Sequence, residues 1–133
     1  MKTTKFLLVA TLMFGFIQIG AAKDPKPPKF PEKIQIAVKN IYDAVDVLRK
    51  YENGQVNEKD CKEQLRKLSK SAEKLIAAEK KVEKNKYRKA LYKDALTNLD
   101  WAQSRIEKNG LKYRAHIMDN LLSAIMKMIG TLL

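Results

Sequence analysis

Beyond Pro31 the chain contains no proline, and its apolar residues recur at alternating spacings of four and three positions. This spacing stacks apolar side chains along one face of an α-helix and does not match the alternation of a half-buried strand. Residues 32–51 show it first, and the Asn53-Gly54 pair that follows suits a left-handed C-terminal cap. The apolar positions of this first predicted helix are Ile34, Val38, Ile41, Val45, Leu48 and Tyr51.

A second helix is predicted after this turn. Asn57 is a suitable N-cap, and Asp60 follows three residues later, where a residue of a capping box would lie. The apolar seam of this helix has the heptad-like register expected inside a helical bundle. Its members are Cys61, Leu65, Leu68, Ala72, Leu75 and Val82.

The apolar face changes sides after Val82. Continuing the same seam would place three lysines in the core, whereas Leu91 lies nine residues on, which is about 180° around an ideal helix. We therefore predict a break at residues 84–86 with Asn85 as the hinge, although no glycine or proline enforces it. A third helix then runs to Gly110, and its apolar positions are Tyr87, Leu91, Ala95, Leu99, Ala102 and Ile106.

Residues 111–133 complete the pattern as a fourth amphipathic helix. Four amphipathic helices joined by short connections predict an all-α fold, an up-and-down four-helix bundle. The alternative is a three-helix bundle in which one long kinked helix covers residues 58–108.

The start of the chain is expected to lie outside this bundle. Residues 1–22 have a short positive start, an apolar run and small residues before Ala22, which is the layout of a secretory signal peptide. The run is shorter than the roughly 20 apolar residues that span a bilayer, which argues against an uncleaved anchor. We therefore expect a secreted or periplasmic protein after cleavage near Ala22. Residues 23–31 hold all four prolines and are predicted to be a tether, with one bundle domain at residues 32–133.

Loss of residues 1–22 would leave 25 basic residues against 15 acidic ones, a net charge of +10. Cys61 is the only cysteine, so it cannot form an internal disulfide, and packing has to supply the stability. Two interpretations of Cys61 stay open. It is a small core residue, or it is accessible and couples two chains into a homodimer.

The only histidine, His116, projects to the polar side of the last helix, opposite the methionines. A haem site needs inward-facing axial ligands, and a zinc site needs more than His116 and Asp119. We therefore expect no cofactor and no metal. The chain also lacks a nucleophile elbow, a phosphate-binding glycine-rich loop and a second histidine, so we expect that it is not an enzyme.

The apolar arc of the last helix is slightly wider than a core requires toward the C-terminus. Most of it is expected to form one wall of the bundle. Its margin is a candidate contact surface for a second subunit or a partner helix, and alternatively for a membrane surface. The candidate residues are Met126, Met128, Leu132 and Leu133.

Positive charge is concentrated in residues 80–93, which carry +6 of the expected +10. Such a run is commonly a solvated surface, but its position where two helices meet creates a field that attracts anionic surfaces. Tyr87 and Tyr92 lie within it and are compatible with either core or surface. The candidate binding residues are Lys80, Lys81, Lys84, Lys86, Arg88, Lys89 and Lys93.

These features predict an exported, non-enzymatic helical bundle that acts by binding. Its expected partner is a protein or an anionic envelope or membrane surface. The sequence contains no recognised nucleic-acid-binding motif, so nucleic acid is not the expected partner. Trp101 lies off the apolar line of its helix and is expected to be partly exposed. The alternative function is a membrane-active effector or toxin that uses the C-terminal helix.

Overall fold

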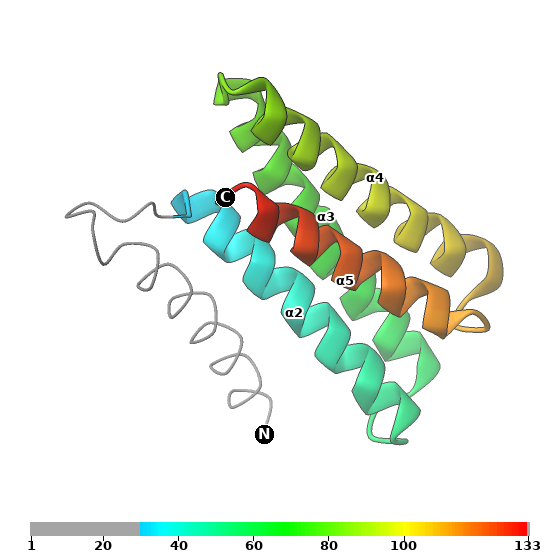
Figure 1. Cartoon of the computed structure of the whole chain (residues 1–133). Coiled ribbons are helices and arrows are strands. Elements are labelled where there is room, and N and C mark those ends of the chain that lie inside the picture. The colour runs from blue at the N-terminus through cyan, green and yellow to red at the C-terminus, as the bar shows by residue number, and fades with distance from the viewer. Residues whose placement is uncertain (1–29, 133) are drawn as a thin grey trace.

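The structure is a computed structural model in which residues 30–132 are described. They form four α-helices, α2 (Glu32–Glu52), α3 (Glu58–Val82), α4 (Lys86–Asn109) and α5 (Arg114–Gly130). Successive helices run in opposite directions, and each packs against two neighbours, so that α2 lies beside α3 and α5, and α4 beside α3 and α5 (Figure 1). The predicted up-and-down four-helix bundle is confirmed, and the three-helix alternative is wrong. The predicted signal peptide lies outside the described residues.

Local capping explains where the helices begin and end. Gly54 takes a φ of 75° after α2, and its backbone N–H donates to the carbonyl of Tyr51 at 3.0 Å. The side chain of Asn57 accepts from the backbone N–H of Asp60 at 2.8 Å and so caps α3. The predicted first turn and second N-cap are therefore confirmed.

The break between α3 and α4 lies where the change of apolar phase predicts it. Asn85 is the N-cap of α4, and its side chain accepts from the backbone N–H of Arg88 at 3.0 Å. The carboxylate of Glu83 accepts from the backbone N–H of Asn85 at 3.2 Å. A capping asparagine and a carboxylate thus close the turn without a glycine or a proline.

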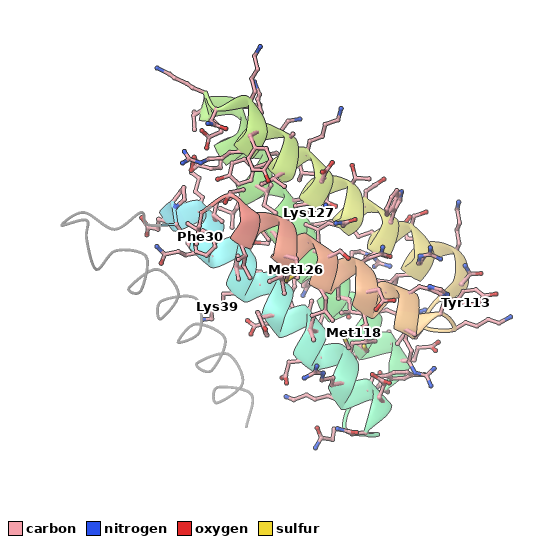
Figure 2. The ribbon with its side chains drawn as sticks, viewed as in Figure 1. Phe30, Lys39, Tyr113, Met118, Met126 and Lys127 are labelled. Atoms are coloured by element: carbon pink, nitrogen blue, oxygen red, sulfur yellow. The ribbon has the colours of Figure 1, made fainter. Side chains whose placement is uncertain are left out.

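The core lies between the four helices and is made almost entirely of aliphatic side chains. Tyr92 is its largest fully buried member, and Cys61 is buried with the rest. Phe30 is also buried and lies at the start of α2 (Figure 2), where it belongs to the core cluster. The other large, fully buried side chains are Ile34, Ile41, Leu48, Leu65, Ile76, Leu99, Leu111, Ile117, Leu121 and Met128.

Three details of the predicted core are wrong. Val82 and Tyr87, which were assigned to apolar seams, are 66% and 68% exposed. The last helix begins at Arg114 rather than at Leu111, because residues 111–113 form a turn that buries Leu111 outside the helix. The apolar seams of α3 and α4 thus continue past the point where other helices cover them.

Helix lengths explain why this happens. At one end of the bundle the helices are level, since Arg114 at the start of α5 pairs with Glu52 at the end of α2 at 3.8 Å. At the same end Gly110 approaches Glu58 and Lys62 of α3. However, α3 has 25 residues against 21 in α2, and α4 has 24 against 17 in α5. At 1.5 Å per residue, α3 and α4 therefore extend about 6 Å and about 10 Å past their neighbours at the opposite end.

We call this projecting part, residues 77–91, the α3–α4 tip. It contains no buried side chain, and it extends beyond the start of α2 and the end of α5 (Figure 1). The last buried residue of α3 before it is Ile76, and the first of α4 after it is Tyr92. The tip is therefore a helical hairpin held by its own turn, by α3–α4 contact and, at Leu91, by the end of α5, with solvent on its remaining sides.

Candidate functional site

The predicted basic residues gather on the α3–α4 tip. Six of the seven are exposed, and Lys80 is half-buried. Lys93 lies just below the tip on α4, and the other six lie within it. We call these residues the basic cluster; its members are Lys80, Lys81, Lys84, Lys86, Arg88, Lys89 and Lys93.

The cations of the basic cluster are not paired with carboxylates of the described residues. Within the described part of the chain, none of the seven cations forms an ion pair with a carboxylate. The tip holds two acidic residues, Glu79 and Glu83, and one carboxylate oxygen of Glu83 accepts from the backbone N–H of Asn85. Asp94 follows the cluster directly, but its carboxylate lies 4.0 Å from the ammonium of Lys127 on α5. The field of the cluster is thus directed into solvent.

The two helix ends at the tip affect these cations in opposite ways. The first turn of α4 contains no acidic residue, and instead carries Lys86, Arg88 and Lys89 close to the positive end of the helix dipole. Folding favours the opposite arrangement, with carboxylates at a helix N-terminus. Lys80 and Lys81 lie in the last turn of α3, where positive charge is favourable. The cations of α4 therefore have no explanation in the stability of their helix.

Two apolar side chains are exposed in the same region. Val82 ends α3 and Tyr87 is the second residue of α4, so they stand on the two sides of the turn. In the described residues, no large apolar side chain is more exposed than Tyr87, at 68%, and Val82 is 66% exposed. The tip therefore combines the basic cluster with two exposed apolar side chains, which the sequence pattern had assigned to the apolar seams of α3 and α4.

The base of the tip is fixed by contacts with the end of α5. Tyr92 is buried there and shares a side-chain hydrogen bond with Thr131. Burial raises the pKa of the Tyr92 phenol, and the nearby carboxylates of Glu83 and Glu79 raise it further, against the lowering effect of the Thr131 hydrogen bond and of Arg88. This contact joins α4 to the C-cap residue of α5 where the tip begins.

The predicted apolar margin of the last helix divides between surface and core. Met126 is 66% exposed and projects from α5 (Figure 2), as a contact residue requires. Met128 is fully buried, because it faces the bundle interior with Ile125 and Leu121, and its assignment to an exposed contact was wrong. Leu132 packs half-buried against the core, and Leu133 lies outside the described residues.

Cys61 and His116 have clear positions. Cys61 is buried, and burial raises the pKa of its thiol to about 11, with a smaller contribution from Glu58. His116 is exposed, as predicted, and its ring lies 6.2 Å from that of Tyr113. Among residues 30–132, no three His, Cys, Asp or Glu side chains are grouped closely enough to hold a metal ion.

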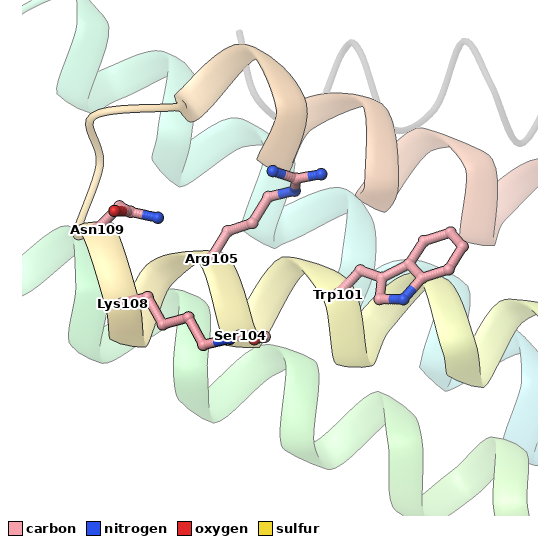
Figure 3. A pocket seen from close by; sticks show the side chains of 5 residues that line it. All are labelled: Trp101, Ser104, Arg105, Lys108 and Asn109. Carbon is pink, nitrogen blue, oxygen red and sulfur yellow. The ribbon is translucent and has the colours of Figure 1, made fainter.

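A shallow hollow of about 350 Å³ lies on α4, away from the tip. Trp101 is 54% exposed on it, which agrees with its predicted partial exposure. Arg105 reaches toward α5, where its Nε donates to the side-chain oxygen of Asn120 at 3.3 Å (Figure 3). The residues that line the hollow are Trp101, Ser104, Arg105, Lys108 and Asn109.

Comparison with known proteins found no matching family, no similar curated protein and no similar solved structure. None of the helices in residues 30–132 combines the length and the hydropathy that a membrane span needs. The geometry of this chain is therefore the basis for any functional proposal.

Proposed function

We propose that the protein is a non-enzymatic binding protein whose basic cluster contacts an anionic surface. The observation that carries this proposal is the projection beyond the rest of the bundle of cations that form no ion pair with a carboxylate of the described residues. The cluster reaches solvent on a part of the chain that α2 and α5 do not cover. A partner surface can therefore approach it without steric interference from the other two helices.

Electrostatics sets the expected behaviour of such a contact. Exposed charges interact within a Debye length of about 8–10 Å at physiological ionic strength, which is comparable with the length of the tip. Several cations held on one short hairpin then act together on an anionic surface. Binding should be strong at low salt and weaken steeply as the salt concentration rises.

The experiment uses protein expressed from the full coding sequence, so that any processing takes place. Binding to immobilised heparin and to anionic vesicles is measured as a function of salt, and we expect both to weaken between low salt and about 0.5 M. Neutralising the seven residues of the basic cluster to glutamine should abolish both. Binding that does not depend on salt, or that survives this variant, would rule the proposal out.

A matched control separates the effect of the basic cluster from the effect of net charge alone. Seven other exposed basic residues, all outside the basic cluster, are neutralised in a second variant with the same net charge. It should retain most of the binding, because its charge is removed from places that do not project. The control positions are Lys33, Lys39, Lys59, Arg66, Lys67, Lys70 and Lys108.

The alternative function, a membrane-active effector or toxin that uses the C-terminal helix, has a different requirement. The apolar face of α5 packs into the core through Ile117, Leu121, Ile125 and Met128. Membrane insertion through that face would therefore require α5 to leave the bundle. Dye release from liposomes by the whole protein, and not only by an excised peptide of residues 111–133, would support this alternative.

A further inference from the structure

We propose that the anionic surface is a phospholipid bilayer, and that Val82 and Tyr87 enter its interface while the basic cluster contacts the headgroups around them. This inference rests on the proposed function and names its partner. It is carried by the coincidence of two exposed apolar side chains with a cationic, projecting hairpin. Neither feature alone distinguishes a lipid surface from a soluble polyanion.

Helix lengths account for the exposure of Val82 and Tyr87, but they do not explain why these exposed positions carry apolar residues. Both stand where no other helix covers α3 and α4, and the tip that holds them buries no side chain. Glutamine or lysine would serve a solvated helix better, because valine and tyrosine have lower helix propensity. An interface between water and hydrocarbon accounts for both residues, since valine is apolar and tyrosine combines an apolar ring with a polar hydroxyl.

The shape of the site favours a bilayer over a soluble anionic chain. The tip forms a projecting end of the bundle, where α3 and α4 meet at a short turn (Figure 1). A flat, deformable surface can surround such a tip on all sides. In this arrangement the flexible lysine side chains can extend to headgroups while their apolar stems lie beside Val82 and Tyr87.

Counted per side chain, the electrostatic and the apolar contributions to membrane binding have comparable size. Each Lys or Arg near an anionic membrane surface contributes about 1 kcal/mol, which is about a fivefold change in binding. An apolar side chain that moves from water into the interface contributes a similar amount. Removal of both apolar side chains should therefore lower partitioning into anionic vesicles at least about tenfold.

The test compares V82Q, Y87Q and the double variant on three probes. These are vesicles of equal parts phosphatidylcholine and phosphatidylglycerol, vesicles of phosphatidylcholine alone, and soluble heparin. Glutamine is a good helix former, so these exposed substitutions should not unfold the hairpin. We expect the double variant to lose at least about tenfold in affinity for the anionic vesicles and to keep its affinity for heparin.

M126Q is the matched control, because Met126 is as exposed as Val82 but lies on α5 outside the tip. It should bind both anionic probes like the unsubstituted protein.

If M126Q lowers vesicle binding and the double variant does not, the docking surface is α5 and the inference is overturned. If the double variant binds vesicles and heparin normally, the partner is a soluble or proteinaceous anion, and the proposed function survives without its lipid partner. If no anionic probe binds in a salt-dependent way, the proposed function itself has failed.

A spectroscopic measurement locates the contact. Trp101 is the only tryptophan, and it lies on α4 about 20 Å from the start of that helix by its 1.5 Å rise. The emission of the unsubstituted protein should not change with anionic vesicles. The double variant Y87W/W101F should show a blue shift, because its indole enters the interface. A blue shift in the unsubstituted protein but not in this variant would place the contact on the Trp101 face and overturn the inference.

Discussion

The thiol of Cys61 donates a hydrogen bond to the backbone carbonyl of Val47 at an Sγ–O distance of 3.8 Å, which joins α3 to α2 inside the core. Burial raises the pKa of this thiol to about 11. At about pH 8 the thiolate should then be roughly one part in a thousand, and the sulfur is also sterically covered. We expect a thiol reagent such as Ellman's reagent to react with Cys61 only after a denaturant is added.

The same observation bears on the predicted homodimer. A disulfide between two chains would need the Cys61 sulfur to leave the core, so oxidation of the native protein should produce no covalent dimer. Rapid reaction with Ellman's reagent under native conditions, or a reducible dimer on a gel, would contradict the buried position. Either result would support a covalent homodimer through Cys61.

Stability should fall in alkaline solution. The Cys61 thiol has an ordinary pKa of 9.0 and a folded value of about 11, and burial also raises the pKa values of the Tyr92 and Tyr42 phenols. The unfolded chain therefore loses these protons first. Their contribution is complete below pH 9 and is lost as the pH rises toward 11, by about 2–3 kcal/mol for the thiol.

This pH dependence can be measured by urea unfolding at a series of pH values. C61A should be less stable than the unsubstituted protein at neutral pH, and the difference should shrink as the pH approaches 11. A constant difference across this interval would show that the thiol does not ionise differently in the two states.

Truncation of two methionines that lie two residues apart should have very different effects on stability. Met128 is fully buried, so M128A removes core contacts and leaves a cavity, at a cost of about 2–4 kcal/mol. Met126 is 66% exposed, and M126A should change the free energy of unfolding by less than about 0.5 kcal/mol. Chemical denaturation of the two variants checks this. Equal losses would mean that the margin of α5 is packed differently.

The elements of this fold could be predicted from the sequence because each is encoded locally. The spacing of Ile34, Val38 and Ile41 predicts α2, and the cap residues Asn57 and Asn85 mark the starts of α3 and α4. The phase change after Val82 predicts the break, because a single helix cannot present two opposite apolar faces to one core.

The tip could not be predicted in the same way. The seam that places Val82 and Tyr87 in the core assumes that partner helices cover the whole of α3 and α4. Whether they do depends on the relative lengths and alignment of four helices, which is not encoded in the local pattern. The basic cluster could be found by counting charges, but its combination with exposed apolar residues required the structure.

Glycine provides a further pair of opposite predictions. Gly130 ends α5 in a helical conformation, and an added Cβ would lie 3.3 Å from a methyl carbon of Leu91, so Leu91 would have to shift by a few tenths of an ångström. We expect this shift because Leu91 is only half-buried, and G130A should then stabilise the bundle by about 0.5 kcal/mol. Gly110 has a φ of 59°, so G110A should destabilise the bundle by about 1 kcal/mol or more. If thermal unfolding shows that G130A destabilises the bundle, Leu91 is too tightly held to move.

Charge reversal at the two ends of the turn tests whether the basic cluster is retained for binding. Lys81 lies in the last turn of α3, and Lys86 is the first residue of α4. Both are exposed, and replacing either with glutamate removes the same charge from the cluster. K86E places a carboxylate at a helix N-terminus, whereas K81E places one at a helix C-terminus, so K86E should be the more stable variant by about 1 kcal/mol at low salt.

Relief of repulsion among the cations is common to K81E and K86E, so the difference in their stability isolates the helix dipole. Both variants should bind anionic vesicles more weakly than the unsubstituted protein, by similar factors, because each loses the same charge from the cluster. K86E should thus be more stable than the unsubstituted protein and yet weaker in binding. Thermal unfolding and vesicle sedimentation on the same samples measure the two effects, and a K86E variant that gains stability without losing affinity would show that the cations at the start of α4 are not part of the binding surface.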